Sequence, residues 1–181
     1  MERATRGRLA ELAEERATIP FHGELGGRAS TLGPIIRLFP KWSVREADRR
    51  WCAAFVYYCC VEAGFDIPYS PRECVSCSLA GCGGWEEFAK GDDRIGYYRR
   101  GEGAVPEAGD IVLYDRVFID REHDHIGIIV GTGGGTITAA EGNVGNTNLS
   151  GLVRRPVDGH IRAYIRIPDG YRYGARGLLP G

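Results

Sequence analysis

The sequence predicts an α+β fold in which N-terminal helices pack on an antiparallel β-sheet. Two observations lead to this class. Before residue 94 the apolar residues recur at helical spacing, whereas after it they alternate in short segments with a period near two. Strands that follow one another through short turns pair antiparallel, and helices that precede such strands in the chain are typical of α+β proteins.

Length and charge narrow the class of protein. The chain has 181 residues, which favours one domain, and 23 basic against 24 acidic residues give a net charge of −1. This balance excludes the cationic surface of a nucleic-acid binder. The longest apolar run, residues 51–61, is too short to span a membrane. We expect a globular monomer with no nucleic-acid partner and no membrane span.

The N-terminal half contains three predicted helices. Residues 3–17 form a short amphipathic helix, and residues 21–41, rich in Gly and Pro, form an irregular approach segment. The strongest helical pattern covers residues 52–63, with apolar positions at i, i+3, i+4 and i+7, and Gly64 closes it. A further helix is predicted around residues 78–90.

The C-terminal half contains five predicted strands. They cover residues 110–114, 125–130, 136–140, 151–155 and 161–167. A run of glycines at residues 131–135 predicts a hairpin turn, and not a phosphate-binding loop, because no Lys follows it. The Gly- and Arg-rich tail, residues 170–181, is expected to be loosely held.

All six cysteines lie between positions 52 and 82. A disulfide framework would tie distant segments together, so this clustering indicates free thiols in a reducing compartment. Cys59 and Cys60 stand in an apolar run and are expected to be small buried hydrophobic residues.

Cys52 differs from the other cysteines because it begins the strongest helix. Unpaired N–H groups and the helix dipole at that position favour the thiolate and lower the pKa of the thiol. Ser43 and Glu46 resemble a capping box, and one unbroken helix from there would place Cys52 mid-helix and remove this activation. We therefore predict a break near Arg50 or Trp51.

His125 and Glu141 are candidates to act with this thiol. His125 opens one predicted strand, and Glu141 and Asn143 end the next. In a hairpin centred on residue 133, His125 and Glu141 lie opposite each other. An imidazole oriented by an acidic or amide group, beside a helix-terminal thiol, is the arrangement of thiol proteases.

Four segments resemble the motifs of CHAP domains, the cysteine, histidine-dependent amidohydrolases/peptidases. They are WCAAFV at 51–56, PEAGDIV at 106–112, DHIGII at 124–129 and EGN at 141–143. The resemblance runs from about residue 51 to residue 167 and includes SCS at 76–78. It implies a papain-like α+β fold, with the nucleophile on a helix and the base on the sheet. It also implies cleavage of amide bonds in bacterial peptidoglycan peptides.

Carried over residue by residue, the resemblance implies four site residues. Cys52 is the nucleophile, His125 the base, Glu141 the residue that orients it, and Asn143 a further polar member. The reaction passes through a thioester and needs no cofactor. Both an endopeptidase and an N-acetylmuramoyl-L-alanine amidase fit this site.

The predicted organisation has three parts. Residues 1–45 are a lead segment that packs on the domain, 46–168 the catalytic domain and 169–181 a tail. Residues 1–20 are charged throughout and have no apolar centre, so we expect no secretory signal. Synthesis is then cytoplasmic, with release by lysis or a phage-type route.

Other readings of the sequence stay open. Cys74, Cys77 and Cys82 hint at zinc, but a fourth ligand is missing and the spacing fits no standard finger. His123 and His125 form a metal pair only if further ligands join them. Some CHAP domains carry an Asp-rich calcium loop, yet residues 23–41 contain no Asp. We expect no metal.

The alternative functions are a cysteine amidase or acyltransferase on a cytosolic peptide conjugate, and a catalytically idle binding module.

Overall fold

The computed structural model describes residues 4–24, 27, 29–40 and 50–174. The helices are α1 (Arg6–Thr18), α2 (Gly33–Ile36), α3 (Cys52–Glu62), α4 (Cys82–Gly91) and the 3-10 turn Val144–Asn146. The strands are β1 (Gly96–Arg99), β2 (Ile111–Tyr114), β3 (His125–Gly133), β4 (Thr136–Glu141), β5 (Gly151–Pro156) and β6 (Ile161–Arg166).

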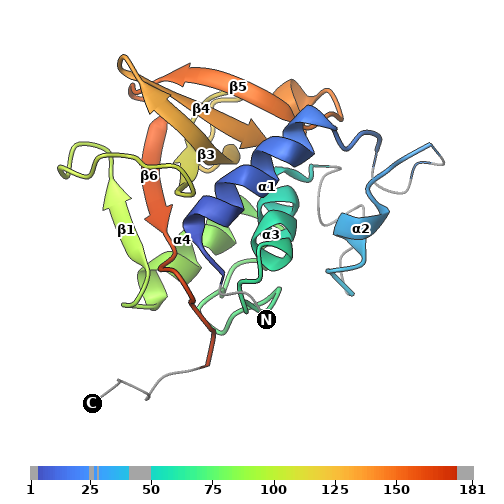
Figure 1. Cartoon of the computed structure of the whole chain (residues 1–181), viewed down its shortest axis with the longest axis horizontal. Coiled ribbons are helices and arrows are strands. Elements are labelled where there is room, and N and C mark those ends of the chain that lie inside the picture. The colour runs from blue at the N-terminus through green and yellow to red at the C-terminus, as the bar shows by residue number, and fades with distance from the viewer. Residues whose placement is uncertain (1–3, 25–26, 28, 41–49, 175–181) are drawn as a thin grey trace.

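The strands form one antiparallel sheet in the order β1-β6-β2-β3-β4-β5. β1 and β5 are its edges, and α1 lies across α3 beside the sheet (Figure 1). All four α-helices precede the six strands in the chain, and the 3-10 turn lies between β4 and β5. This arrangement confirms the predicted α+β class and agrees with a papain-like fold.

Two apolar clusters hold the layers together. The larger one joins α1, α3 and α4 to the helix-facing side of the sheet, through residues such as Leu9, Phe55 and Ile128. The smaller one fills the other side, where Val112, Ile129 and other strand residues are fully buried. Adjacent residues of β3, Ile128 and Ile129, belong to different clusters, as strand alternation requires.

The start of α3 agrees with the predicted break. Trp51, the residue before the helix, has non-helical angles (φ −134°, ψ 20°), so Cys52 is the first residue of α3. The capping box of Ser43 and Glu46 lies outside the described residues. The thiol of Cys52 therefore stands at the positive end of the helix dipole.

Several element predictions need correction. α4 begins four residues later than predicted, at Cys82, because residues 78–81 form a turn in which the Ser78 hydroxyl accepts from the Ala80 N–H. The segment expected to be irregular contains the single turn α2, with Pro at its start. β1 was not predicted, because its four residues carry little alternation and it is half-buried.

The glycine-rich hairpin is confirmed. β3 runs to Gly133, and Gly134 and Gly135 form the turn with positive φ values of 57° and 71°. Two such residues are typical of the turn that matches strand twist.

The beginning of the tail is not loosely held, contrary to expectation. Tyr171 is buried, and its hydroxyl donates to Asp92 at the end of α4. The backbone N–H of Tyr173 donates to the carbonyl of Asp66. Residues 175–181 lie outside the described part of the chain.

Among the helices that are described, none has the length and apolar character needed to cross a membrane.

Candidate active site

Cys52 and Cys82 bring the starts of two helices together. Cys52 is the first residue of α3 and Cys82 the first of α4, and neither helix has a side-chain cap. Their sulfur atoms are 3.9 Å apart. The pKa of Cys52 is well below its usual range because the Cys82 thiol donates to its sulfur; burial opposes this and His125 adds to it. The site thus favours a thiolate at position 52.

His125 lies between this thiol and a carboxylate. Its Nε2 donates to Glu141 Oε2 at 2.8 Å, and the ring also interacts with the Cys52 thiol. The ring stacks on Tyr114, with centroids 6.0 Å apart, and meets the Phe118 ring edge-to-face at 4.7 Å. Burial alone lowers the pKa of His125, but hydrogen bonds to Cys52 and Glu141 outweigh burial and raise the pKa to about 9. The imidazolium is therefore stabilised beside the thiolate.

The predicted register between His125 and Glu141 is wrong, although the two side chains meet. Ile128 pairs with Ala140, and this register places Gly127 opposite Glu141. The turn lies at Gly134 and Gly135, beyond residue 133, and a bulge between Ile129 and Gly131 shifts the register again. The carboxylate reaches His125 diagonally across Gly127.

Gly127 makes this diagonal contact sterically possible. A Cβ at this position would lie 2.9 Å from Cγ of Glu141 and 3.1 Å from the carbonyl oxygen of Ala140. Both distances are shorter than ordinary contacts, so a side chain here would displace the carboxylate.

Arg155 is a member of the site that sequence reasoning missed. It donates to both carboxylate oxygens of Glu141, from Nε and Nη2, each at 2.8 Å. Its guanidinium also lies over the Tyr114 ring, 5.0 Å from the centroid. Burial raises the pKa of Glu141, but the bonds from Arg155 and His125 outweigh burial and keep it below its usual value. Neither a local signal nor the strand register reveals Arg155, because it pairs with Ile137 while Glu141 pairs with Gly151, and only the course of its long side chain brings it to the carboxylate.

Asn143 follows Glu141 by two residues, and its side-chain amide hydrogen-bonds within the next turn. Its Oδ1 accepts from the Asn148 N–H at 2.9 Å, and its Nδ2 donates to Asn146 at 3.2 Å. The residue is buried and takes a left-handed conformation, with φ 50°. Before it, Gly142 packs against α3 so closely that a Cβ would lie 2.5 Å from the Cβ of Phe55.

The three cysteines considered for zinc do not converge. Cys74 donates to the carbonyl of Gly84, Cys82 faces Cys52, and Cys77 is exposed. In the described ranges, no group of three or more His, Cys, Asp or Glu is placed to hold a metal. His123 precedes β3 and bonds to Glu86 of α4 through Nε2 at 2.6 Å.

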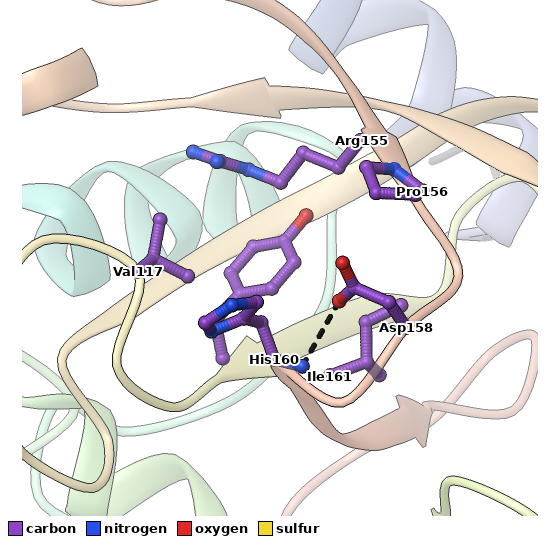
Figure 2. A pocket seen from close by; sticks show the side chains of 7 residues that line it. Val117, Arg155, Pro156, Asp158, His160 and Ile161 are labelled. Carbon is purple, nitrogen blue, oxygen red and sulfur yellow. Dashed lines mark hydrogen bonds between the residues drawn. The ribbon is translucent and has the colours of Figure 1, made fainter.

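Arg155 also lines a cavity of about 170 Å³. Its lining includes Arg155 and Pro156 of β5, Val117, and Asp158 and His160 from the turn before β6 (Figure 2). The Asp158 carboxylate accepts from the His160 backbone N–H across its rim. Arg155 therefore contacts the cavity on one side and holds Glu141 on the other.

Comparison with known proteins identifies one family. The sequence profile described as the CHAP domain matches residues 44–143, more than half of the chain. No curated protein matches. Among solved structures, the crystal structure of Ly7917 is similar at 16% identity and a TM-score of 0.44, covering 65% of this chain. The match covers 53% of the Ly7917 chain, so this chain corresponds to about half of that length.

Proposed function

The chain belongs to the CHAP domain family of cysteine, histidine-dependent amidohydrolases/peptidases, and from this premise we propose that it cleaves amide bonds in bacterial peptidoglycan peptides. Family membership itself indicates a hydrolase acting on amide bonds. One observation supports a catalytic role for this site: the Cys52 thiol and the His125 ring each shift the pKa of the other, and Nε2 of His125 hydrogen-bonds to Glu141 at 2.8 Å.

Cys52 is the proposed nucleophile. As a thiolate beside the His125 imidazolium, it attacks the amide carbonyl and forms a tetrahedral intermediate. Backbone N–H groups at the start of α3, which lack a side-chain cap, stabilise the oxyanion. His125 then protonates the leaving amine, and water resolves the thioester.

Glu141 and Arg155 are the proposed positioning residues for His125. The carboxylate orients the ring and stabilises its charged form, and Arg155 fixes the carboxylate in place with two hydrogen bonds. We assign Asn143 to shaping the turn after Glu141, since its amide bonds within that turn.

Digestion of purified peptidoglycan tests this function. The wild-type protein is expected to release fragments whose masses identify the bond: an endopeptidase cuts within the peptide, and an amidase separates the peptide from the sugar. Cys52→Ala is expected to release none. The matched control is Cys59→Ala, because Cys59 is also on α3 but is fully buried, and burial raises its pKa well above the usual value.

Two outcomes would contradict the proposal. Fragment release by purified Cys52→Ala would exclude the assigned nucleophile. A wild-type protein that cleaves a synthetic peptide amide but leaves peptidoglycan intact would exclude the substrate and favour a cytosolic peptide conjugate.

A further inference from the structure

Cys82 is a second thiol at the nucleophile, and the proposed reaction does not consume it. Its sulfur is 3.9 Å from that of Cys52, although the two residues are 30 positions apart in the chain. Both residues are 8% exposed, so they are enclosed but not sealed from small molecules. The remaining α3 cysteines, Cys59 and Cys60, are fully buried in the core.

The two sulfurs differ in protonation. Two uncapped helix starts, those of α3 and α4, meet at this point and favour one negative charge. The Cys82 thiol donates to the Cys52 sulfur, an interaction that lowers the pKa of Cys52 and raises the pKa of Cys82. Cys52 is thus the oxidisable thiolate, and Cys82 is a protonated thiol in contact with it.

We propose that Cys52 and Cys82 form a reversible oxidation site, at which a hydroperoxide converts the pair into an intramolecular disulfide. The proposal rests on the proposed function only in that the same sulfur serves as nucleophile. It adds a class of reactant, hydroperoxides, and a covalent modification that stops amide hydrolysis.

The chemistry balances in two steps. The Cys52 thiolate attacks one oxygen of the hydroperoxide, the O–O bond breaks, and Cys52 becomes a sulfenic acid while alkoxide or hydroxide leaves. The Cys82 sulfur then attacks the Cys52 sulfur, the S–O bond breaks, and the thiol proton of Cys82 leaves with the hydroxyl group as water. Two thiols are oxidised by two electrons, and the peroxide is reduced. An external dithiol reverses the modification.

The geometry favours the second step. A disulfide is about 2.0 Å long, so the sulfurs must approach by about 1.9 Å from their observed separation of 3.9 Å. Cys77 is exposed and its sulfur accepts from the Ser76 hydroxyl, and the Cys74 thiol donates to the carbonyl of Gly84, whereas the Cys82 sulfur lies 3.9 Å from that of Cys52. Cys82 is therefore the thiol placed to trap a sulfenic acid on Cys52 before further oxidation.

Mass spectrometry of the wild-type protein tests the pairing without any variant. After treatment with hydrogen peroxide, we expect an intact mass lower by two hydrogens that dithiothreitol restores. Combined trypsin and chymotrypsin digestion places Cys52 on fragment 52–55 and Cys82 on fragment 80–85, each without another cysteine. A disulfide between these two fragments is the expected product. A sulfinic acid on Cys52 with no cross-link, or a cross-link of Cys82 to Cys77, would overturn the proposal.

Activity recovery gives a second readout. Wild-type protein treated with peroxide is expected to regain most of its hydrolytic activity in dithiothreitol, whereas Cys82→Ser regains almost none because Cys52 proceeds to sulfinic acid. Cys74→Ser is the matched control, since Cys74 is a free thiol next to α4 that does not contact Cys52, and it is expected to recover like wild type. Equal recovery of Cys82→Ser and wild type would contradict the inference. If the Cys52–Cys82 disulfide forms in a protein that does not cleave peptidoglycan, the proposed function is rejected and the oxidation site stands.

Discussion

At the scale of the residue, the candidate site depends on how one carboxylate is shared. Glu141 is fully buried and accepts hydrogen bonds from His125 on one side and Arg155 on the other. A buried carboxylate without partners would be protonated, whereas three charge-assisted hydrogen bonds, one from His125 and two from Arg155, keep it ionised. Its charge in turn stabilises the imidazolium of His125, and the imidazolium stabilises the thiolate of Cys52.

The pH dependence of hydrolysis follows from these shifts. The active pair, thiolate and imidazolium, exists above the lowered pKa of Cys52 and below the pKa of His125, about 9. We therefore expect kcat/KM to be flat near neutrality and to fall as the pH rises through about 9. Glu141→Gln removes the charge that stabilises the imidazolium, so its alkaline limb should move to lower pH.

A pH–rate profile on a peptide amide checks this expectation. Glu11→Gln serves as control, because Glu11 is an exposed carboxylate of α1, and its profile should match wild type. An alkaline limb that stays in place in Glu141→Gln would show that Glu141 does not set the pKa of His125.

Replacement of Arg155 should affect turnover more than substrate binding. In Arg155→Met the buried charge of Glu141 loses two hydrogen bonds, which is expected to cost about 3 kcal/mol of stability and to misorient His125. We expect kcat to fall at least tenfold while KM changes little. Steady-state kinetics and urea unfolding measure both effects.

Arg154→Met is the matched comparison for this change. Arg154 is the preceding residue of β5, and its Nε donates to Thr136 on the exposed surface. Similar kcat values for the two variants would contradict a positioning role for Arg155.

At the scale of the element, the β3–β4 hairpin decides whether His125 and Glu141 can meet. Its two-glycine turn and its bulge place them on diagonal positions, with Gly127 between. Diagonal neighbours in an antiparallel pair are within reach of long side chains. A glycine at the intervening position leaves the Glu141 side chain free to cross.

Gly127→Ala tests this arrangement. The added methyl group would lie 2.9 Å from Cγ of Glu141, so we expect the carboxylate to move away and kcat/KM to fall by about tenfold or more, the change that a barrier rise of about 1.4 kcal/mol gives. Gly131→Ala is the control. Gly131 lies on the same strand, and a Cβ added there would meet no atom within 4 Å. If Gly127→Ala keeps wild-type activity, the close approach does not constrain Glu141.

At the scale of the whole molecule, the N-terminal helix packs on the matched domain although it lies before residue 44, where the family match begins. Leu9 and Leu12 of α1 are buried in the larger cluster with α3 and β3. Arg6 contacts Glu107 and Asp110, which in turn bind Arg166. We propose that the lead segment belongs to the same folding unit as the catalytic domain.

Leu9→Ala tests whether α1 is part of that unit. Deleting a fully buried leucine side chain is expected to lower the free energy of unfolding by about 2–5 kcal/mol. Glu14→Ala, an exposed change on the same helix, should alter it by less than about 0.5 kcal/mol. Urea unfolding followed by tryptophan fluorescence measures both. An unchanged midpoint in Leu9→Ala would mean that α1 folds separately from the rest.

Local pattern alone determined much of this protein. The helical period predicted α1 and α3, alternation predicted five of the six strands, and the placement of Cys52 at a helix start follows from where the apolar period begins. The family motifs added the fold and the class of reaction. These features depend on neighbours in the chain, so their signals are present in the sequence.

Only the tertiary structure decided which residues meet across elements. The β3–β4 register depends on a turn position and a bulge that alternation does not encode, because alternation gives the buried face but not the partner residue. Arg155 reaches Glu141 from a neighbouring strand, and Cys82 reaches Cys52 from another helix. Such contacts arise when separate elements pack, and no spacing within one element specifies them.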